Sequence, residues 1–259
     1  MHSVARAVAG PAKWVVTIFL LAIGAGCDVW APPAPTPAEY DRGLVVMYPG
    51  STNTRSEMTG FHTGLRDAGI DQAIEVVPWA LPFVRYVLPG TFLTDQRPWA
   101  RAEAMRISAY RGTHPGVAVT LLGFSGGAMM AIMVAEELPE GIGVDSVILL
   151  SAGVSSGYDL TAMLEKSTGG AFVYFSPREE FALWLAQTFG TVDGDFQRPA
   201  AVFGFDMTHP GLTQLSWDAA MQAEFGNNGD HFDYFLNPAW IARHVAPWVA
   251  PAPPGQTSN

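Results

Sequence analysis

Short apolar runs alternate along the chain with longer segments that have helical periodicity. Apolar runs without polar alternation are typical of strands that are buried on both faces of a parallel sheet. The predicted strands are residues 43–48, 73–77, 117–124, 144–150, 171–175 and a short one at 200–205, and the predicted helices are 56–68, 97–111, 127–138, 180–188 and 238–245. This alternation predicts an α/β fold of about six strands, in which helices flank a mostly parallel central sheet on both faces.

Residues 1–26 have the organisation of an export signal peptide. Arg6 and Lys13 make its first part positively charged. The apolar stretch 14–26 that follows is too short to span a bilayer as a helix. The stretch ends in Gly-Ala-Gly before Cys27, the only cysteine of the chain, and this end resembles the lipobox of bacterial lipoproteins. Gly24 departs from that motif, which usually has Leu there. The resemblance implies an exported, membrane-anchored lipoprotein that is lipidated at Cys27, and an ordinary cleaved signal is the alternative.

Proline-rich segments lie on both sides of the predicted domain. Residues 27–40 are predicted to form a stiff, extended tether, and residues 251–259 a disordered tail. The remaining residues, 41–250, have the length of a single α/β domain. The apolar segment 80–96 does not fit the strand and helix pattern. It is either an extra segment that faces the substrate or a part packed against the body of the domain.

Acidic residues outnumber basic ones by 24 to 14, which gives a formal net charge of −10. Such a surface repels phosphate backbones, so we expect no nucleic-acid partner. It also disfavours binding to anionic lipid by charge, so the lipid anchor would have to supply membrane attachment. The sequence contains neither the His and Cys spacing of a zinc site nor a phosphate-binding loop. We therefore expect no metal and no cofactor, and the sequence does not indicate the oligomeric state.

Residues 123–127, Gly-Phe-Ser-Gly-Gly, match the motif G-x-S-x-G. The motif alone is weak, because glycine and serine are common residues. Here it stands between a predicted strand and a predicted helix, and a serine on so tight a turn is pushed out above the sheet. Glycine on either side of the serine lets neighbouring backbone approach closely. The context therefore indicates that Ser125 is a nucleophile.

The serine turn and the order of the strands together resemble the α/β-hydrolase fold over residues 41–250. A serine hydroxyl needs a general base, and in this fold the base follows the acid late in the chain. His231 lies in a turn-rich loop before the last predicted helix, where the fold places its base. His209, also in a loop, is the alternative, whereas His244 falls inside a predicted helix and is assigned as a surface or packing residue.

The acid of such a triad follows the predicted strand 171–175. The resemblance assigns this role to Glu179, which stands where the family often has Asp, so glutamate is a departure from the pattern. Asp193 and Asp195 are alternatives, because their loop could fold back toward the histidine. The acid would orient the imidazole and stabilise its charged form during turnover.

The oxyanion that forms during attack on an acyl carbon needs two backbone N–H donors. The resemblance assigns the first to Gly126. The second comes from the loop after strand 43–48, where the family often has His-Gly and this chain has Pro-Gly. Either Ser51 or Thr52 would supply it, and the sequence does not separate the two.

The resemblance implies hydrolysis of a carboxylic ester, either a small molecule or a lipid, through an acyl-enzyme. The acyl-enzyme step is shared with other reactions, so a peptidase or an acyltransferase on the same fold is an alternative. A surface lipoprotein that has the fold without the activity is a further alternative, from outside the enzymes.

Overall fold

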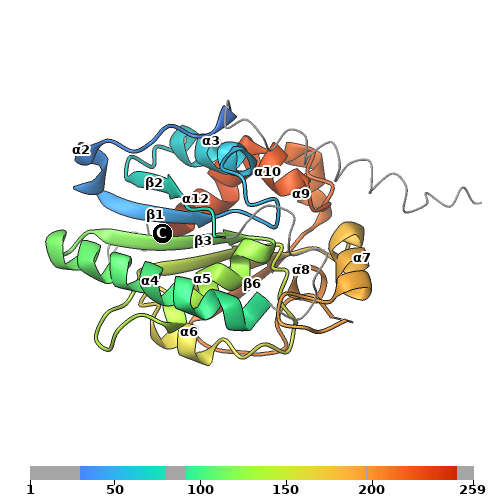
Figure 1. Cartoon of the computed structure of the whole chain (residues 1–259). Helices are drawn as coiled ribbons and strands as arrows, with labels where there is room; N and C mark the ends of the chain where they lie inside the picture. Colours follow the sequence, from blue (N-terminus) through green and yellow to red (C-terminus); the bar gives the residue numbers. More distant parts are fainter. Residues whose placement is uncertain (1–29, 80–91, 197, 250–259) are drawn as a thin grey trace, which may run out of the picture.

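The computed structural model describes residues 30–79, 92–196 and 198–249 (Figure 1). In this part of the chain six strands form one parallel sheet in the order β2-β1-β3-β4-β5-β6. The strands are β1 (Gly43–Tyr48), β2 (Ala73–Val76), β3 (Ala118–Phe124), β4 (Ser146–Leu150), β5 (Ala171–Phe175) and β6 (Leu212–Ser216). The predicted α/β class with a parallel central sheet is confirmed.

Helices cover both faces of this sheet (Figure 1). One face carries α4 (Phe92–Thr113), α5 (Gly126–Glu136) and α6 (Thr161–Glu165). The other carries α3 (Thr59–Asp67), α10 (Asp233–Leu236), α11 (Pro238–Trp240), the π-helical turn η3 (Ile241–Val245) and α12 (Ala246–Val249). The remaining helices are α2 (Pro37–Tyr40), the 3₁₀ turn η2 (Ser56–Met58), α7 (Glu180–Phe189), α8 (Ala200–Phe203) and α9 (Ala219–Phe225).

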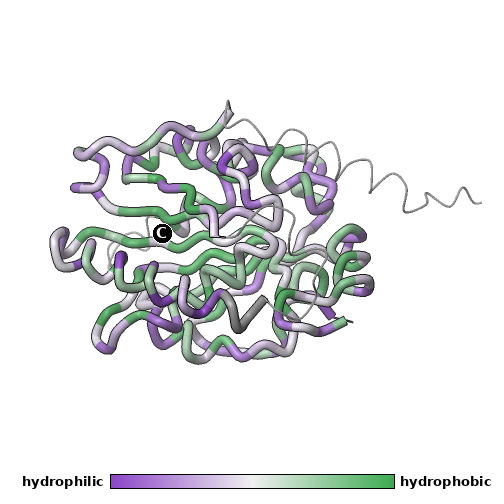
Figure 2. Tube along the Cα trace, in the orientation of Figure 1, coloured by the Kyte–Doolittle hydropathy of each residue, from purple (hydrophilic) through white to green (hydrophobic). Residues whose placement is uncertain are grey.

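The core consists of two apolar clusters, one on each face of the sheet. All residues of β1 and β4 are buried, because both faces of these strands are covered. Helix α5 is buried around its whole circumference from Gly126 to Ala135, which is why its sequence is apolar without a polar face. Figure 2 shows hydrophobic colouring along the central strands and hydrophilic stretches on the surrounding helices. The helix that follows Ser125 is therefore held firmly by the core.

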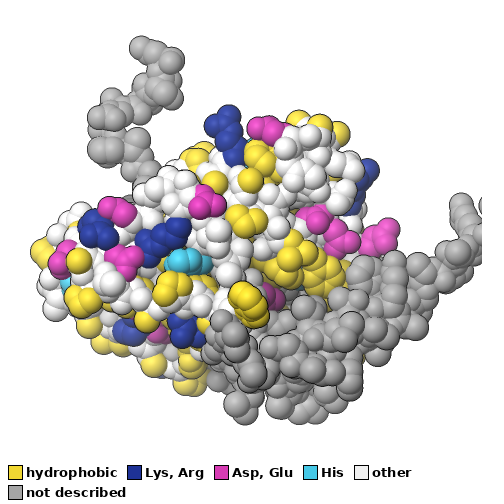
Figure 3. All heavy atoms as spheres, turned by 90° about the horizontal axis from the view of Figure 1, so that it is seen from above, with side chains coloured by type: hydrophobic (Ala, Val, Ile, Leu, Met, Phe, Trp, Pro, Cys, Tyr) yellow, Lys and Arg dark blue, Asp and Glu magenta, His cyan; other side chains and the backbone are white. Residues whose placement is uncertain are grey.

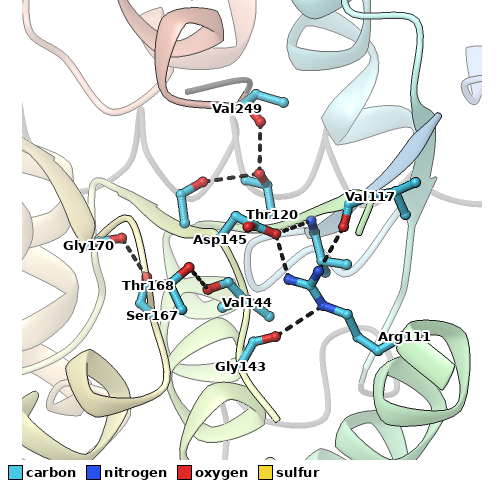
Figure 4. Close-up of polar contacts among 12 residues, drawn as sticks. Arg111, Val117, Thr120, Gly143, Val144, Asp145, Ser167, Thr168, Gly170 and Val249 are labelled. Atoms are coloured by element: carbon cyan, nitrogen blue, oxygen red, sulfur yellow. Dashed lines mark hydrogen bonds and ion pairs between the residues drawn. The ribbon is translucent and has the colours of Figure 1, made fainter. Parts of the chain in front are cut away.

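A polar cluster ties together the amino ends of β3 and β4 (Figure 4). The Arg111 guanidinium donates to Asp145 Oδ2 over 2.5 Å and to the Val117 carbonyl over 2.7 Å, and the Val119 amide donates to the same carboxylate over 2.7 Å. Thr120 donates to the carbonyl of Val249, at the end of α12, over 3.1 Å. These contacts satisfy polar groups at the edge of the sheet opposite to Ser125.

Two sequence predictions about elements need correction. Residues 200–205, predicted as a strand, instead begin with the short helix α8, which packs against β5. The sixth strand is Leu212–Ser216, which the apolar pattern missed, because it is an edge strand whose residues are only partly buried or exposed. Of the unexplained segment 80–96, residues 92–96 belong to α4, and 80–91 lie outside the described residues.

The surface of the described residues is mixed in character. Figure 3 shows Lys and Arg side chains beside Asp and Glu side chains on the face seen from above. None of the helices in the described ranges is both long and apolar enough to cross a membrane. The predicted leader with Cys27, and the predicted tail 251–259, lie outside the described residues.

Candidate active site

Ser125 lies on a strained turn between β3 and α5. Its φ of 53° and ψ of −121° fall in a region that residues with a side chain rarely adopt. The backbone is fixed on both sides, because the Ser125 amide donates to the Leu150 carbonyl over 2.9 Å and the Ser125 carbonyl accepts from Gly153 over 3.0 Å. Such a turn at the carboxyl end of a central strand holds the side chain out from the sheet.

The glycines of the motif are required by close backbone contacts. A Cβ atom on Gly123 would lie 2.5 Å from the Ala128 Cα, and one on Gly127 would lie 2.2 Å from the Tyr48 carbonyl oxygen. Both distances are shorter than non-bonded atoms tolerate. The serine turn therefore depends on glycine at both positions, which is the physical content of G-x-S-x-G in this chain.

His231 and Glu179 form a buried hydrogen-bonded pair. The Glu179 Oε2 lies 2.7 Å from the His231 Nδ1, and both side chains are almost completely withdrawn from solvent. An ionised carboxylate can only accept, so Nδ1 carries the proton and Nε2 is left as an acceptor. Burial raises the pKa of the Glu179 carboxyl, whereas His231 and the Ser151 hydroxyl lower it. The aromatic ring of Phe124, next to Ser125 in the chain, lies 5.0 Å from the His231 ring.

Sequence reasoning missed Ser151, which belongs to the same cluster. It follows β4 with a φ of 49°, and its fully buried Oγ lies 2.8 Å from the His231 Nδ1. Its hydroxyl also lowers the pKa of Glu179, as a donor to that carboxylate does. Ser151 therefore contacts both members of the pair. The sequence offered no signal for it, because Ser155 and Ser156 lie in the same loop.

Ser151→Ala is expected to lower kcat about tenfold and leave KM nearly unchanged, because a hydrogen bond to a charged group contributes on the order of 1.5–3 kcal/mol. Steady-state kinetics on a p-nitrophenyl ester measures both constants. The matched control is Ser146→Ala, at the start of β4, the strand that Ser151 follows. Ser146 is also buried, but it donates to the Trp248 carbonyl. An equal loss of kcat in both variants would show that Ser151 has no special relation to His231.

The alternative acids make other contacts. Asp193 accepts from the Ser155 amide over 2.8 Å and from the Ser155 hydroxyl. Asp195 is exposed, and its Oδ1 accepts from the Arg198 amide over 3.1 Å. The structure thus brings Glu179, and not these two residues, into hydrogen-bond contact with His231.

The alternative histidines lie elsewhere as well. His209 is exposed and comes just before β6, at the amino end of a parallel sheet, whereas Ser125 follows the carboxyl end of β3. Its Nδ1 accepts from the Gly211 amide over 3.1 Å. His244 stacks on Trp240 in the last helical segment, with ring centroids 5.6 Å apart. His231 is thus the histidine beside a buried acid at the carboxyl edge of the sheet.

The loop after β1 lies against the start of α5. A Cβ on Gly126 would lie 2.8 Å from the Ser51 Oγ and 3.7 Å from the Ser51 backbone nitrogen. Thr52 is turned toward Thr54, with 3.5 Å between their hydroxyl oxygens. Trp79 holds the loop, because its indole N–H donates to the Pro49 carbonyl over 2.8 Å and its amide donates to the Asn53 Oδ1 over 2.8 Å. Ser51 is therefore the loop residue that faces Gly126.

The described residues contain no group of three or more His, Cys, Asp and Glu side chains that could hold a metal ion. The carboxyl edge of the sheet instead carries the strained turn of Ser125 and the buried pair of His231 and Glu179. An arrangement of this kind can transfer a proton to and from a serine hydroxyl.

No protein-family profile and no curated protein sequence matches the chain. Solved structures do match. Lipase B of Aspergillus fumigatus superposes with a TM-score of 0.52 at 11% identity, over 83% of this chain and 54% of that lipase. A carboxylesterase of Bacillus subtilis gives 0.45 at 10% identity, over 93% and 100% of the two chains. A lidless serine hydrolase of Xanthomonas campestris gives 0.47 at 18% identity, over 85% and 88%. The chain has the α/β-hydrolase fold, as predicted.

Proposed function

We propose that the protein is a serine hydrolase that cleaves carboxylic esters, with Ser125 as nucleophile, His231 as general base and Glu179 as the acid. One observation carries the proposal. The buried contact of 2.7 Å between Glu179 and His231 lies at the same edge of the sheet as the strained turn of Ser125. Burying a carboxylate against an imidazole is unfavourable unless the two are paired, and at a site of this kind the pair serves proton transfer.

In the proposed reaction the His231 Nε2 takes the hydroxyl proton while the Ser125 Oγ bonds to the acyl carbon. The same proton passes to the alcohol as the ester bond breaks, which leaves an acyl-serine. A water molecule then gives one proton to Nε2 and its oxygen to the acyl carbon. The carboxylic acid leaves, and Ser125 recovers its proton. Throughout, Glu179 keeps Nδ1 protonated and stabilises the imidazolium.

The oxyanion of both tetrahedral intermediates is assigned to the backbone amides of Gly126 and Ser51. The first follows the nucleophile and opens α5, where the helix dipole favours negative charge. Ser51 is preferred over Thr52 because Ser51 faces Gly126. A Cβ atom placed on Gly126 would lie 3.7 Å from the Ser51 backbone nitrogen. The Gly126 amide opens a buried helix, and two hydrogen bonds from Trp79 hold the loop that contains Ser51, so little reorganisation is expected when the charge develops.

The substrate is proposed to be an ester of a small molecule or of a lipid. Lipase B of Aspergillus fumigatus, which has the same fold, is named as a lipase. The test is turnover of p-nitrophenyl esters of short and long acyl chains by the wild-type protein, with labelling of the protein by a fluorophosphonate. Absence of both turnover and labelling would contradict the proposal and show that the protein has the fold without the hydrolase activity.

The lipoprotein character also stays a proposal, and it rests on the sequence around Cys27 alone. In a bacterial host, metabolic labelling with palmitate is expected to mark the wild-type protein. The Cys27→Ser variant, expressed to the same level, is expected to be unlabelled. Label that persists in this variant would contradict the anchor and favour an ordinary cleaved signal.

A further inference from the structure

Glu57 brings a second carboxyl group to the serine turn. It lies in η2, on the segment that joins β1 to α3, and follows the loop that contains Ser51. A Cβ placed on Gly50 would lie 3.0 Å from the Glu57 Oε1 and 3.2 Å from the Ser125 Cβ. The carboxyl and the nucleophile are therefore separated only by a glycine. No part of the proposed reaction uses this group.

The surroundings of the Glu57 carboxyl do not suit a permanent negative charge. Its Oε2 is withdrawn from solvent and has no hydrogen-bond partner among the described residues. Burial raises the pKa of Glu57 to about 7, against smaller opposing effects of the Thr52 hydroxyl, His231 and the Gly50 amide. No Lys or Arg of the described part of the chain is among the groups that lower this pKa. The neighbouring Arg55 instead donates to the Pro32 carbonyl over 3.1 Å.

Two charges of the proposed reaction, the imidazolium of His231 and the oxyanion at Ser125, would lie close to the Glu57 carboxyl. His231 is the titratable group that faces it from the loop before α10, and Glu179 lies behind His231. The oxyanion would develop beside Ser125, next to Gly50. An ionised Glu57 would oppose that negative charge, and it would also favour a protonated His231 in the free enzyme, which is not the form that acts as a base.

We propose that Glu57 controls the pH dependence of ester hydrolysis, its neutral form supporting the oxyanion at Ser125 and its ionised form suppressing it. This inference rests on the proposed function and adds a regulating residue to that site. Glu57 is a positioning residue in this role, since it acts through the Gly50–Ser51 loop and through its charge. A carboxyl so close to the oxyanion would change the rate about 10- to 100-fold between its two forms.

The experiment measures kcat/KM for an uncharged p-nitrophenyl ester from about pH 5 to about pH 10, for the wild type, Glu57→Gln and Glu165→Gln. Glu165 is an exposed residue at the end of α6 and serves as the matched control. The wild type is expected to lose activity at low pH, as the base is protonated, and again above about pH 7, as Glu57 ionises. Glu57→Gln is expected to keep the acid limb and lose the alkaline limb, so that it exceeds the wild type about tenfold at about pH 9. Glu165→Gln is expected to follow the wild type.

A wild-type profile without an alkaline limb, or a Glu57→Gln profile that retains it, would overturn the proposal. The wild-type pH profile alone can overturn the proposal, so the proposal remains testable even if Glu57→Gln does not fold. Glu57→Asp provides a second variant, which keeps the titrating group and is expected to keep an alkaline limb at a shifted pH. These outcomes differ from a failure of the proposed function, in which the wild type shows neither turnover nor fluorophosphonate labelling at any pH.

Discussion

Ser125→Ala is expected to lower kcat/KM for a p-nitrophenyl ester by about 10⁴- to 10⁶-fold and to abolish fluorophosphonate labelling. The reason is the loss of the only atom that can bond to the acyl carbon in the proposed reaction. Binding and the oxyanion donors remain, so a small residual rate above that of water is expected. Alanine meets the same backbone restriction at a φ of 53° as serine does, so the fold should be unchanged.

The matched control is Ser216→Ala, at the end of the edge strand β6. Ser216 is exposed, and its hydroxyl donates to the neighbouring Trp217 carbonyl over 3.3 Å. Circular dichroism and thermal melting should be the same for the wild type and both variants. Turnover and labelling that survive in Ser125→Ala would place the nucleophile elsewhere and contradict the assigned site.

Glu179→Gln is expected to lower kcat by about 10³- to 10⁴-fold with little change in KM. The amide has the shape of the carboxylate but no charge, and its NH₂ group can donate to Nδ1 and so favour the wrong tautomer of His231. Glu179→Asp keeps the charge on a side chain that is one methylene shorter, so a smaller loss, about 10- to 100-fold, is expected. Steady-state kinetics of the two variants separates the effect of charge from that of geometry.

Asp193→Asn is the control for this pair, because Asp193 is one of the two alternative acids and accepts hydrogen bonds from Ser155. It is expected to change kcat less than tenfold, although it will weaken the loop. A loss in Asp193→Asn that is much larger than the loss in Glu179→Gln would favour Asp193 as the acid and contradict the assignment of Glu179.

Most of the parallel sheet could be predicted from the sequence, because buried strands are apolar along their whole length. The edge strand Leu212–Ser216 could not, since it pairs only with β5 and its residues are not fully buried. The segment 200–205 was mistaken for a strand because it is apolar and too short to show a helical period. Pro199 stands immediately before α8 and could have indicated the start of a helix.

The residues of the candidate site likewise fall into those that could be predicted from the sequence and those that could not. Ser125, His231 and Glu179 could be selected from a motif, from chain order and from the position of a strand end. Ser151 and Glu57 could not, because their relevance comes only from distances across the fold. Ser151 follows a different strand from Glu179, and Glu57 lies far from His231 in the sequence but faces it in space. Such contacts leave no trace in local spacing.

The amino ends and the carboxyl ends of the parallel strands form two opposite edges of the sheet, and these carry different groups. The amino edge carries Arg111, Asp145 and Thr120, whose hydrogen bonds join strands and the last helix. The carboxyl edge carries the strained turn of Ser125 and the loops with His231 and Glu179. A change of loop length or sequence at the carboxyl edge leaves the polar cluster at the other edge intact. If the proposed function holds, mutations in those loops are expected to change substrate preference while the hydrogen bonds at the amino edge stay in place.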